Sequence, residues 1–298
     1  MSGFRSGIVA VVGRPNLGKS TLVNALVGVK VAIVSDKPQT TRRDIRGILT
    51  TTDAQVVFTD TPGFHKAKTA LGARMNDLVG DAVHGVDVVV QVVDGKSGVG
   101  RGDAYVYERQ VATENCPRFC VVNKIDALTK DLVLPQLAAA AGLGDFDEIV
   151  PLSARAGTGE GTGVELLKEL ILSRLPEGPP LYPIEETTDQ PVEIHLAELV
   201  REQALAVTRE EVPHSVAVVV DEMEREGNLT RVIAALIVER DSQKGILIGR
   251  GGETLKKIGT RARAEMESFL GTKVYLDLRV KVMKEWQRDP KALNRLGL

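Results

Sequence analysis

The stretch that decides the fold reads Gly13-Arg14-Pro15-Asn16-Leu17-Gly18-Lys19-Ser20 and is followed by Thr21. It fits the pattern G-x-x-x-x-G-K-[ST], follows the apolar run 8–12 and precedes an apolar-periodic helix. In such a loop the glycines let backbone N–H groups surround phosphate oxygens at a helix N-terminus. We therefore expect residues 13–21 to bind a nucleoside triphosphate, with Lys19 at the β and γ phosphates and the Ser20 hydroxyl on Mg²⁺.

Short β-branched runs alternate with longer helical stretches through the first 172 residues. Such alternation favours an α/β domain with a mainly parallel sheet, which binds ligands at the carboxyl ends of its strands. Because the valine runs are nearly continuous, we expect strands that are buried on both faces. The expected strands are 8–12, 56–58, 86–93, 119–122 and 149–152.

The composition is that of a globular protein, with 43% hydrophobic and 26% charged residues in a chain of 298, long enough for two domains. No apolar run reaches the ~18 residues of a membrane-spanning helix, and the N-terminal run is too short for a signal peptide. We therefore expect a cytoplasmic protein. Cys116 and Cys120 lie four residues apart without a second pair, which predicts core thiols rather than a zinc site or a disulfide framework.

A proline-rich stretch, 175–183, ends the alternating pattern, because it can continue neither a helix nor a central strand. We expect a nucleotide-binding domain at 1–174, a linker at 175–190 and a second domain at 191–298. The second domain is predicted to be a small α+β unit with a C-terminal helix. Its expected elements are helix 193–206, strands 215–220 and 230–239, helix 253–269 and strand 273–280.

A metal-binding aspartate should stand at a strand end near the phosphate loop, in the pattern D-x-x-G. The pattern occurs twice, as Asp60-Thr61-Pro62-Gly63 and as Asp77-Leu78-Val79-Gly80. We favour the first, because it follows the strand 56–58 and ends in a Pro-Gly turn, whereas Asp77 lies in a helical stretch. Asp60 is then expected to hold Mg²⁺ through water, and the Gly63 N–H to contact the γ-phosphate.

Base recognition is expected at Asn123-Lys124-Ile125-Asp126, which follows the strand 119–122. The Asp126 carboxylate can accept hydrogen bonds from both N1–H and the N2 amine of guanine, which adenine does not offer, so it favours GTP over ATP. Asn123 should tie this loop to the phosphate loop, and the stem of Lys124 should cover the base. Ser153-Ala154 after the last strand should offer a backbone N–H to guanine O6.

The C-terminal fifth of the chain is basic. Residues 240–298 carry a net charge of +7 on a protein whose total is −2. Within them, Gly249-Arg250-Gly251-Gly252 forms a G-x-x-G loop between an apolar segment and a helix, which is the signature of a KH domain, and a final strand after the helix fits its prokaryotic form, type II. RNA phosphates should bind at this loop and at Lys244, Lys256, Lys257, Arg261 and Arg263.

These motifs occur together, and the chain resembles the translation-factor-related class of GTPases and, within it, the Era family of bacterial GTPases. Similar runs continue into the second half at Tyr182-Pro183, 212–215 and 276–282. The resemblance implies hydrolysis of GTP to GDP and phosphate, with Lys19, Thr41 and Gly63 in transition-state or switch roles. It makes Thr41, or alternatively Thr40, a Mg²⁺ ligand beside Ser20 and Asp60. It also implies binding to the 3′ end of 16S rRNA and a role in 30S subunit assembly and rRNA maturation.

Two positions bear on hydrolysis. Phe64 stands where Ras-like enzymes place a glutamine that orients the attacking water, and its ring cannot hydrogen-bond water, so we expect slow turnover. Asn16 in the phosphate loop makes K⁺, through the resemblance, a second candidate cofactor beside Mg²⁺.

Two other functions stay open. The chain could be an RNA-binding adaptor that senses GTP with negligible turnover. It could also be a cell-cycle GTPase with peripheral contact to anionic lipid on the inner face of the cell membrane. The single tryptophan, Trp286, is expected to pack against a C-terminal helix, with stacking on a base as the alternative.

Overall fold

The computed structural model describes residues 3–63, 69–159, 161–208 and 211–298. The chain forms two compact units, one from most of the residues up to Asp189 and one mainly from Gln190–Leu298. None of the helices in these described ranges is long and apolar enough to cross a membrane.

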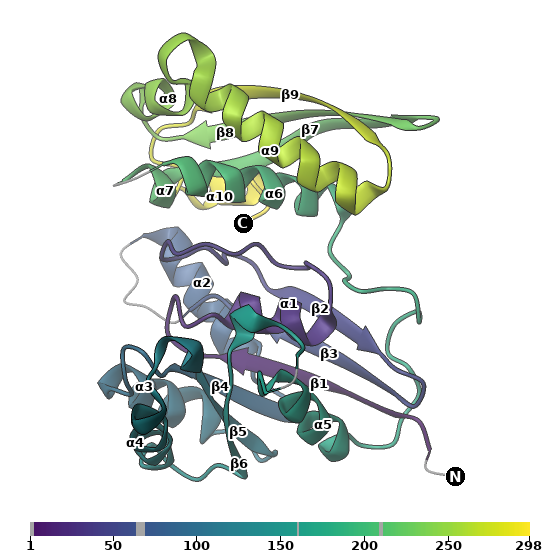
Figure 1. Ribbon diagram of the computed structural model, residues 1–298. Coiled ribbons are helices and arrows are strands. Elements are labelled where there is room, and N and C mark those ends of the chain that lie inside the picture. The colour runs from purple at the N-terminus through teal and green to yellow at the C-terminus, as the bar shows by residue number, and fades with distance from the viewer. Residues whose placement is uncertain (1–2, 64–68, 160, 209–210) are drawn as a thin grey trace. The chain divides into compact units, whose positions relative to one another are not determined.

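The first unit is built on a six-stranded sheet with the order β2-β3-β1-β4-β5-β6 (Figure 1). Neighbouring strands are parallel, except that β2 runs antiparallel to β3. The strands are β1 (Arg5–Val12), β2 (Ile45–Thr50), β3 (Ala54–Asp60), β4 (Val88–Asp94), β5 (Arg118–Asn123) and β6 (Glu148–Pro151). The five expected strands are therefore confirmed with shifts of a few residues at their ends.

The edge strand β2 was not expected from the sequence. Its residues alternate weakly in polarity, and Gly47 in its middle is unfavourable in a strand. The structure explains this glycine, because a Cβ at position 47 would lie 2.9 Å from Val27 Cγ2. Helix packing against the strand, rather than strand propensity, requires the residue.

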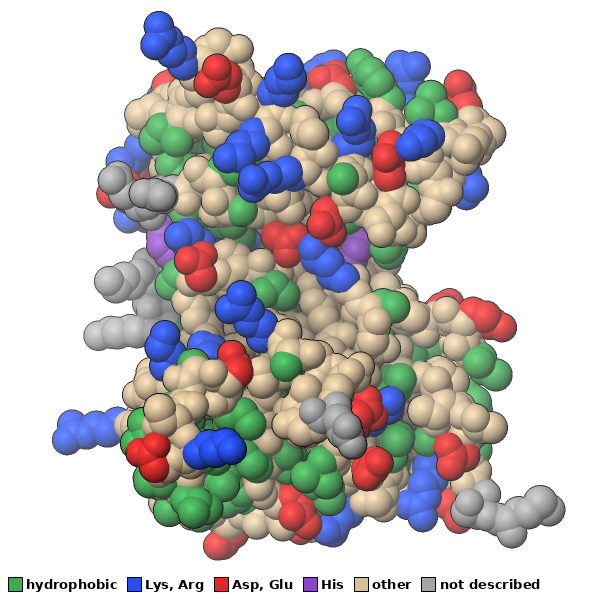
Figure 2. All heavy atoms as spheres, in the orientation of Figure 1, with side chains coloured by type: hydrophobic (Ala, Val, Ile, Leu, Met, Phe, Trp, Pro, Cys, Tyr) green, Lys and Arg blue, Asp and Glu red, His purple; other side chains and the backbone are tan. Residues whose placement is uncertain are grey.

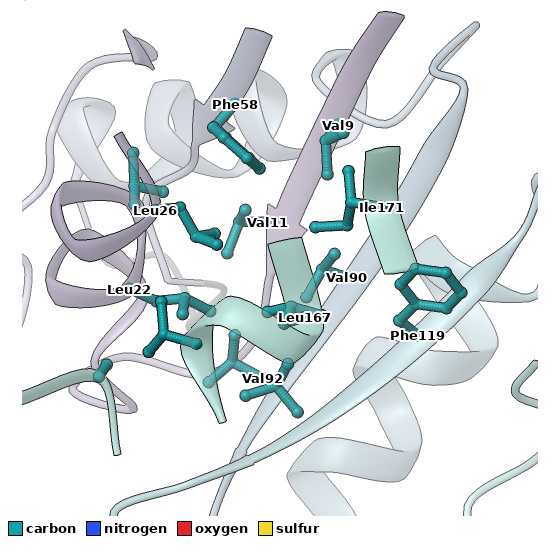
Figure 3. Packing of buried hydrophobic residues seen from close by; sticks show 14 of the residues in the cluster. Val9, Val11, Leu22, Leu26, Phe58, Val90, Val92, Phe119, Leu167 and Ile171 are labelled. Atoms are coloured by element: carbon teal, nitrogen blue, oxygen red, sulfur yellow. The ribbon is translucent and has the colours of Figure 1, made fainter. Parts of the chain in front are cut away.

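Five helices cover the two faces of the sheet: α1 (Lys19–Val27), α2 (Ala70–Asp81), α3 (Arg101–Val106), α4 (Lys130–Ala141) and α5 (Val164–Arg174). Alternate residues of β1 divide between two cores. Val9 and Val11 pack with Leu22 of α1 and Ile171 of α5, as Figure 3 shows. Ala10 and Val12 face the opposite side and pack toward α3. Burial on both faces fixes the strands and therefore the loops at their carboxyl ends.

The second unit is a three-stranded sheet with the order β7-β8-β9, in which β8 is antiparallel to β7 and parallel to β9. Its elements are α6 (Val192–Val207), α7 (Val212–Ser215), β7 (Ala217–Glu226), β8 (Leu229–Val238), α8 (Asp241–Ile248), α9 (Glu253–Leu270), β9 (Lys273–Val282) and α10 (Pro290–Arg295). The small α+β unit is confirmed. Strand β7 begins later than expected, because Ser215 ends the short helix α7. It also extends further than expected, to Glu226.

Two sequence predictions concern single buried residues. Trp286 is fully buried, and its Nε1 donates to the Ser215 carbonyl of α7 at 3.2 Å, so base stacking is the wrong alternative. Packing against a C-terminal helix stays a prediction. Cys120 is buried as a core thiol, and burial raises its pKa to about 12. Cys116 is half-buried and also free.

Candidate guanine-nucleotide site and nucleic-acid interface

The phosphate loop connects β1 to α1 at the carboxyl edge of the sheet. Gly13 (φ 150°) and Gly18 (φ 91°) adopt conformations that side chains disfavour. Space is also lacking, because a Cβ at Gly18 would lie 2.5 Å from Asn123 Nδ2 and one at Gly13 would lie 2.6 Å from the Val92 carbonyl oxygen. The loop can therefore pack closely on the neighbouring strand ends only with glycine at these positions.

Lys19 folds back over this loop. Its Nζ donates to the carbonyl oxygens of Gly13 at 3.1 Å and Arg14 at 3.0 Å. Burial lowers the pKa of Lys19 to about 8, although the charge of Asp60 opposes the shift. Phosphate oxygens beside Lys19 would favour its charged ammonium form. The loop therefore presents a buried cation whose charge an anionic ligand would balance.

Ser20, Thr41 and Asp60 form a compact group of oxygen donors. Ser20 Oγ lies 2.6 Å from Asp60 Oδ2 and 3.0 Å from Thr41 Oγ1, and Thr41 Oγ1 donates to Asp60 Oδ2 at 3.3 Å. The structure thus brings together the three predicted metal ligands from α1, the segment before β2, and the end of β3.

This group suits a divalent cation. Asp60 is fully buried, and its Oδ1 has no hydrogen-bond partner within the described ranges. Burial raises the pKa of Asp60, while Lys19 and the two hydroxyls oppose that rise. A carboxylate and two hydroxyls are oxygen ligands of the kind that Mg²⁺ prefers. A metal ion bound here would give the buried Asp60 Oδ1 a partner and would favour the ionised carboxylate.

The D-x-x-G turn lies against the phosphate loop. A Cβ at Gly63 would lie 2.5 Å from the Pro15 backbone nitrogen, so only glycine permits this approach. Thr61 Oγ1 donates to the Val11 carbonyl at 3.0 Å and anchors the turn to β1, and Pro62 is buried beside it. Phe64 lies outside the residues that the structure describes. The competing Asp77 lies within α2 and not at the end of a strand.

The base-recognition loop is held by Asn123. Its Nδ2 donates to the Leu17 carbonyl at 2.8 Å, and its Oδ1 accepts from the N–H groups of Lys124 (2.8 Å) and Ala154 (3.0 Å). The expected tie between base loop and phosphate loop is present in the geometry. Lys124 Nζ extends it by donating to the Asn16 carbonyl at 2.8 Å.

Asp126 is exposed, and its Oδ1 accepts from Ser153 Oγ at 2.6 Å. Ser153 therefore orients the carboxylate that is expected to read guanine. The backbone N–H that Ser153-Ala154 is expected to offer to guanine O6 stays a prediction. In the structure the Ser153 N–H donates to the Thr162 carbonyl, and the Ala154 N–H donates to Asn123 Oδ1.

Two supporting aspartates were missed from the sequence. Asp94 Oδ2 accepts from Lys124 Nζ at 2.8 Å. Burial alone would raise the pKa of Asp94, but Lys124 and two backbone N–H groups outweigh it and lower that pKa. Asp103 is fully buried and pairs with Arg14 Nε at 2.7 Å. The sequence did contain a signal for each of them, since Asp94 ends a valine-rich strand and Asp103 lies in the first turn of the helix α3.

In the second unit the G-x-x-G loop joins α8 to α9. Gly249, Gly251 and Gly252 all have positive φ, at 72°, 61° and 83°. A Cβ at Gly249 would also lie 2.2 Å from Thr254 Oγ1, whereas Cβ atoms at the other two glycines would meet nothing within 4 Å. The positive φ favours glycine at all three positions, and the open space beside Gly251 and Gly252 leaves room for a ligand.

A groove of about 600 Å³ runs between α9 and the edge strand β9. Three of the predicted RNA contacts line it, namely Gly252, Lys256 and Arg263. The walls also include residues that the sequence did not single out: Leu229, Leu255, Gly259, Thr260, Val274, Tyr275, Leu276 and Leu278.

The remaining predicted basic contacts lie elsewhere. Lys257 and Arg261 are exposed but do not line the groove, because each residue of a helix is turned ~100° from the last. Lys244 is half-buried on α8. Figure 2 shows Lys and Arg side chains distributed over the face of the second unit, with acidic side chains between them.

Comparison with known proteins agrees with both sites. A family model described as 50S ribosome-binding GTPase matches residues 8–124, and a KH-domain model matches residues 211–287. GTPase Era of Mycobacterium bovis (strain BCG / Pasteur 1173P2) is 52% identical over 303 residues, covering 100% of both chains. GTPase Era of Mycobacterium avium (strain 104) is 52% identical over 302 residues with the same coverage.

Solved structures are similar over the same length. Era in complex with MgGDPNP and nucleotides 1506–1542 of 16S ribosomal RNA has a TM-score of 0.93 at 39% identity, covering 99% of each chain. A point variant of Aquifex aeolicus Era bound to GDP.AlF4⁻ has a TM-score of 0.94 at 39% identity, with equal coverage. The predicted fold class, a P-loop GTPase domain followed by a KH domain, is confirmed, and the chain belongs to the Era family of GTPases.

Proposed function

We propose that this GTPase uses its nucleotide state to control binding of the 3′ end of 16S rRNA, and that it acts in 30S subunit assembly and rRNA maturation. One observation carries the proposal: a phosphate loop and a KH groove are both formed in one chain that is 39% identical to Era bound to MgGDPNP and 16S rRNA nucleotides. The proposed domains are 1–174 for GTP, 175–190 as linker and 191–298 for RNA.

For the nucleotide, the proposal assigns residues 13–21 and 60–63 to the phosphates and Asn123, Lys124, Asp126, Ser153 and Ala154 to the base. Lys19 would neutralise developing charge, and Gly63 would contact the γ-phosphate. Ser20, Thr41 and Asp60 would hold Mg²⁺, which supplies charge neutralisation for phosphoryl transfer. Their mutual distances of 2.6–3.3 Å support this set and favour Thr41 over Thr40.

Slow turnover is part of the proposal, because no water-orienting glutamine follows Gly63 in the sequence. Charge compensation by K⁺ is proposed from Asn16 alone. Cytoplasmic location with peripheral membrane contact is proposed from the absence of a spanning helix in the described ranges and from the basic C-terminal segment.

For RNA, the proposal assigns the backbone contact to residues 249–252 and phosphate contacts inside the groove to Lys256 and Arg263. Lys244, Lys257 and Arg261 would add long-range attraction. Tyr275 and the apolar wall residues offer surfaces for unstacked bases.

The decisive experiment titrates the full chain with an RNA of the 3′ end of 16S rRNA, with GDP or with a non-hydrolysable GTP analogue. We expect tighter binding with the analogue, and weaker binding by R250D/G251D with unchanged GTP affinity. At position 251 a Cβ meets no neighbour, and aspartate is among the few residues other than glycine that occasionally adopt a positive φ. Equal RNA affinities in both nucleotide states would contradict gating. Absence of multiple-turnover phosphate release would point to a static adaptor, and liposome pelleting that RNA does not compete would point to a membrane GTPase.

A further inference from the structure

The linker is held against the sheet of the first unit by side chains that belong to no nucleotide motif. Gln55 on β3 is fully buried, and its Oε1 accepts from the N–H groups of Leu181 at 2.7 Å and Tyr182 at 2.9 Å. Its Nε2 donates to the Tyr182 carbonyl at 3.0 Å. On the edge strand β2, the Ile48 N–H donates to the Thr187 carbonyl at 2.8 Å. The linker is therefore fixed along the β2–β3 hairpin.

Three polar side chains close this arrangement. Arg46 Nη1 donates to Tyr182 Oη at 2.9 Å and to Asp189 Oδ2 at 3.1 Å, and Tyr182 Oη donates to the same carboxylate oxygen at 3.1 Å. We name this group the linker clamp. Asp189 is the last residue of the first unit, and Gln190 begins the second. The clamp thus holds the chain at the residue where the KH unit begins.

The strand that carries Arg46 starts next to the metal ligands. Ile45 pairs with Asp60 in the β2–β3 register, and Arg46 pairs with Thr59. Four residues before Ile45, Thr41 donates to Asp60. A rearrangement of residues 38–42 on exchange of GTP for GDP would therefore act directly on the first residues of β2.

We propose that the linker clamp transmits the nucleotide-dependent state of residues 38–42 to the KH unit. The inference rests on the proposed function, because it explains how nucleotide state reaches the RNA groove. Energetically the clamp suits this task. Arg46 and Asp189 keep 47% and 33% of their side-chain surface exposed, so their ion pair adds little to stability and can be broken at small cost.

The test compares the full-length chain with R46A and Y182F. For each protein, the affinity for the 3′-terminal 16S rRNA fragment is measured with GDP and with a non-hydrolysable GTP analogue. The ratio of the two dissociation constants is the coupling factor. A matched control is R5A, because Arg5 on β1 holds the start of the linker: its Nη1 donates to the carbonyls of Ser173 and Leu175.

We expect a wild-type factor of about 10 to fall below about 3 in R46A, and to fall partially in Y182F, while R5A keeps it. GTP affinity and hydrolysis should stay unchanged in all three, because in the described part of the chain these side chains make no hydrogen bond or ion pair with the predicted nucleotide-site residues. A wild-type factor of one would overturn the proposed gating together with the clamp. A wild-type factor above one that R46A and Y182F both retain would overturn the clamp alone. Circular dichroism melting confirms that each variant is folded.

Discussion

Asn123 Nδ2 donates a hydrogen bond of 2.8 Å to the carbonyl oxygen of Leu17, which joins the base loop to the phosphate loop across 106 residues of sequence. The same amide uses its oxygen to accept from Lys124 and Ala154. Three loops therefore share one buried side chain. Ordering any of them by a ligand helps to order the others, so base and phosphate recognition should be energetically coupled.

Guanine specificity is expected to depend on Asp126. Asp126→Asn removes one of the two carboxylate acceptors that the N1–H and N2 amine of guanine require, so GTP affinity should fall by at least ~10²-fold while xanthosine triphosphate gains. Equilibrium titration with both nucleotides measures this. Ser153→Ala is the companion variant, because it removes the 2.6 Å bond that orients the carboxylate, together with the 3.3 Å bond that Ser153 Oγ accepts from the Ala156 N–H. It should weaken GTP less and leave the guanine preference in place. Unchanged GTP affinity in Asp126→Asn would refute the assignment.

The KH groove can be tested with two double variants that remove the same amount of positive charge. Replacing Lys256 and Arg263 with alanine removes two cations that line the groove, whereas replacing Lys257 and Arg261 removes two exposed cations that do not. RNA affinity should fall ~10-fold or more in the first double variant and less than ~3-fold in the second.

The salt dependence provides an independent readout. Loss of two phosphate contacts should reduce the slope of log K against log salt by about 1.4 for single-stranded RNA. The slope of the Lys257/Arg261 variant should change little. Equal losses of affinity and slope in the two variants would mean that net charge, rather than the groove, governs binding.

Stability of the nucleotide-free chain should depend on Asp44. Burial raises the pKa of this carboxyl from its ordinary 3.8 to about 6; Arg46 opposes the shift, and the charges of Asp60 and Asp189 add to it. Its Oδ1 is buried without a hydrogen-bond partner within the described ranges. Because the folded pKa exceeds the unfolded one, ionisation disfavours folding between about pH 4 and 6, and the penalty is complete above pH 6.

Asp44→Asn removes this penalty. The free energy of unfolding should rise by at most about 3 kcal/mol at pH 7.5 and change little near pH 4, where the carboxyl is protonated in the folded state. Urea titrations at the two pH values measure the difference. A variant that is equally or more destabilised at pH 7.5 than at pH 4 would show that the charged carboxylate stabilises the fold.

Hydrolysis without a partner should be slow, near 10⁻⁴ to 10⁻³ s⁻¹, the range of unassisted Ras-like enzymes. Phe64→Ala should change the chemical step little, since the ring does not position water. Single-turnover assays in K⁺ and in Na⁺ at fixed Mg²⁺ test both points. Equal rates in the two salts would eliminate K⁺ as a cofactor, and loss of hydrolysis with intact GTP binding in Phe64→Ala would give that residue a role.

The nucleotide motifs could be located from the sequence because backbone geometry dictates them. Gly13 and Gly18 are required by φ and by their close neighbours, and Asp60 is identified by the strand that it ends. The predicted residues 13–20, 60–63 and 123–126 therefore converge where the parallel strands end. The bond from the Ala154 N–H to Asn123 Oδ1 could not be predicted, because it is a tertiary contact.

Long-range polar partners could not be predicted. Gln55 reads as a polar residue in a strand, yet it is fully buried, and its linker partners lie 126 and 127 residues away. The same holds in the KH unit. Helical periodicity separates Lys256 from Lys257, but only the packing of α9 beside β9 decides which of them faces the groove.

The burial of Trp286 has a practical consequence. It is the single tryptophan of the chain, and its indole is bonded inside the C-terminal unit. Its fluorescence therefore reports the melting of that unit alone, without any label. A ligand that binds only the native state raises the melting temperature of the part it occupies. Heating the intact protein while following tryptophan emission would thus register RNA directly, and would register GTP only to the extent that the two units communicate.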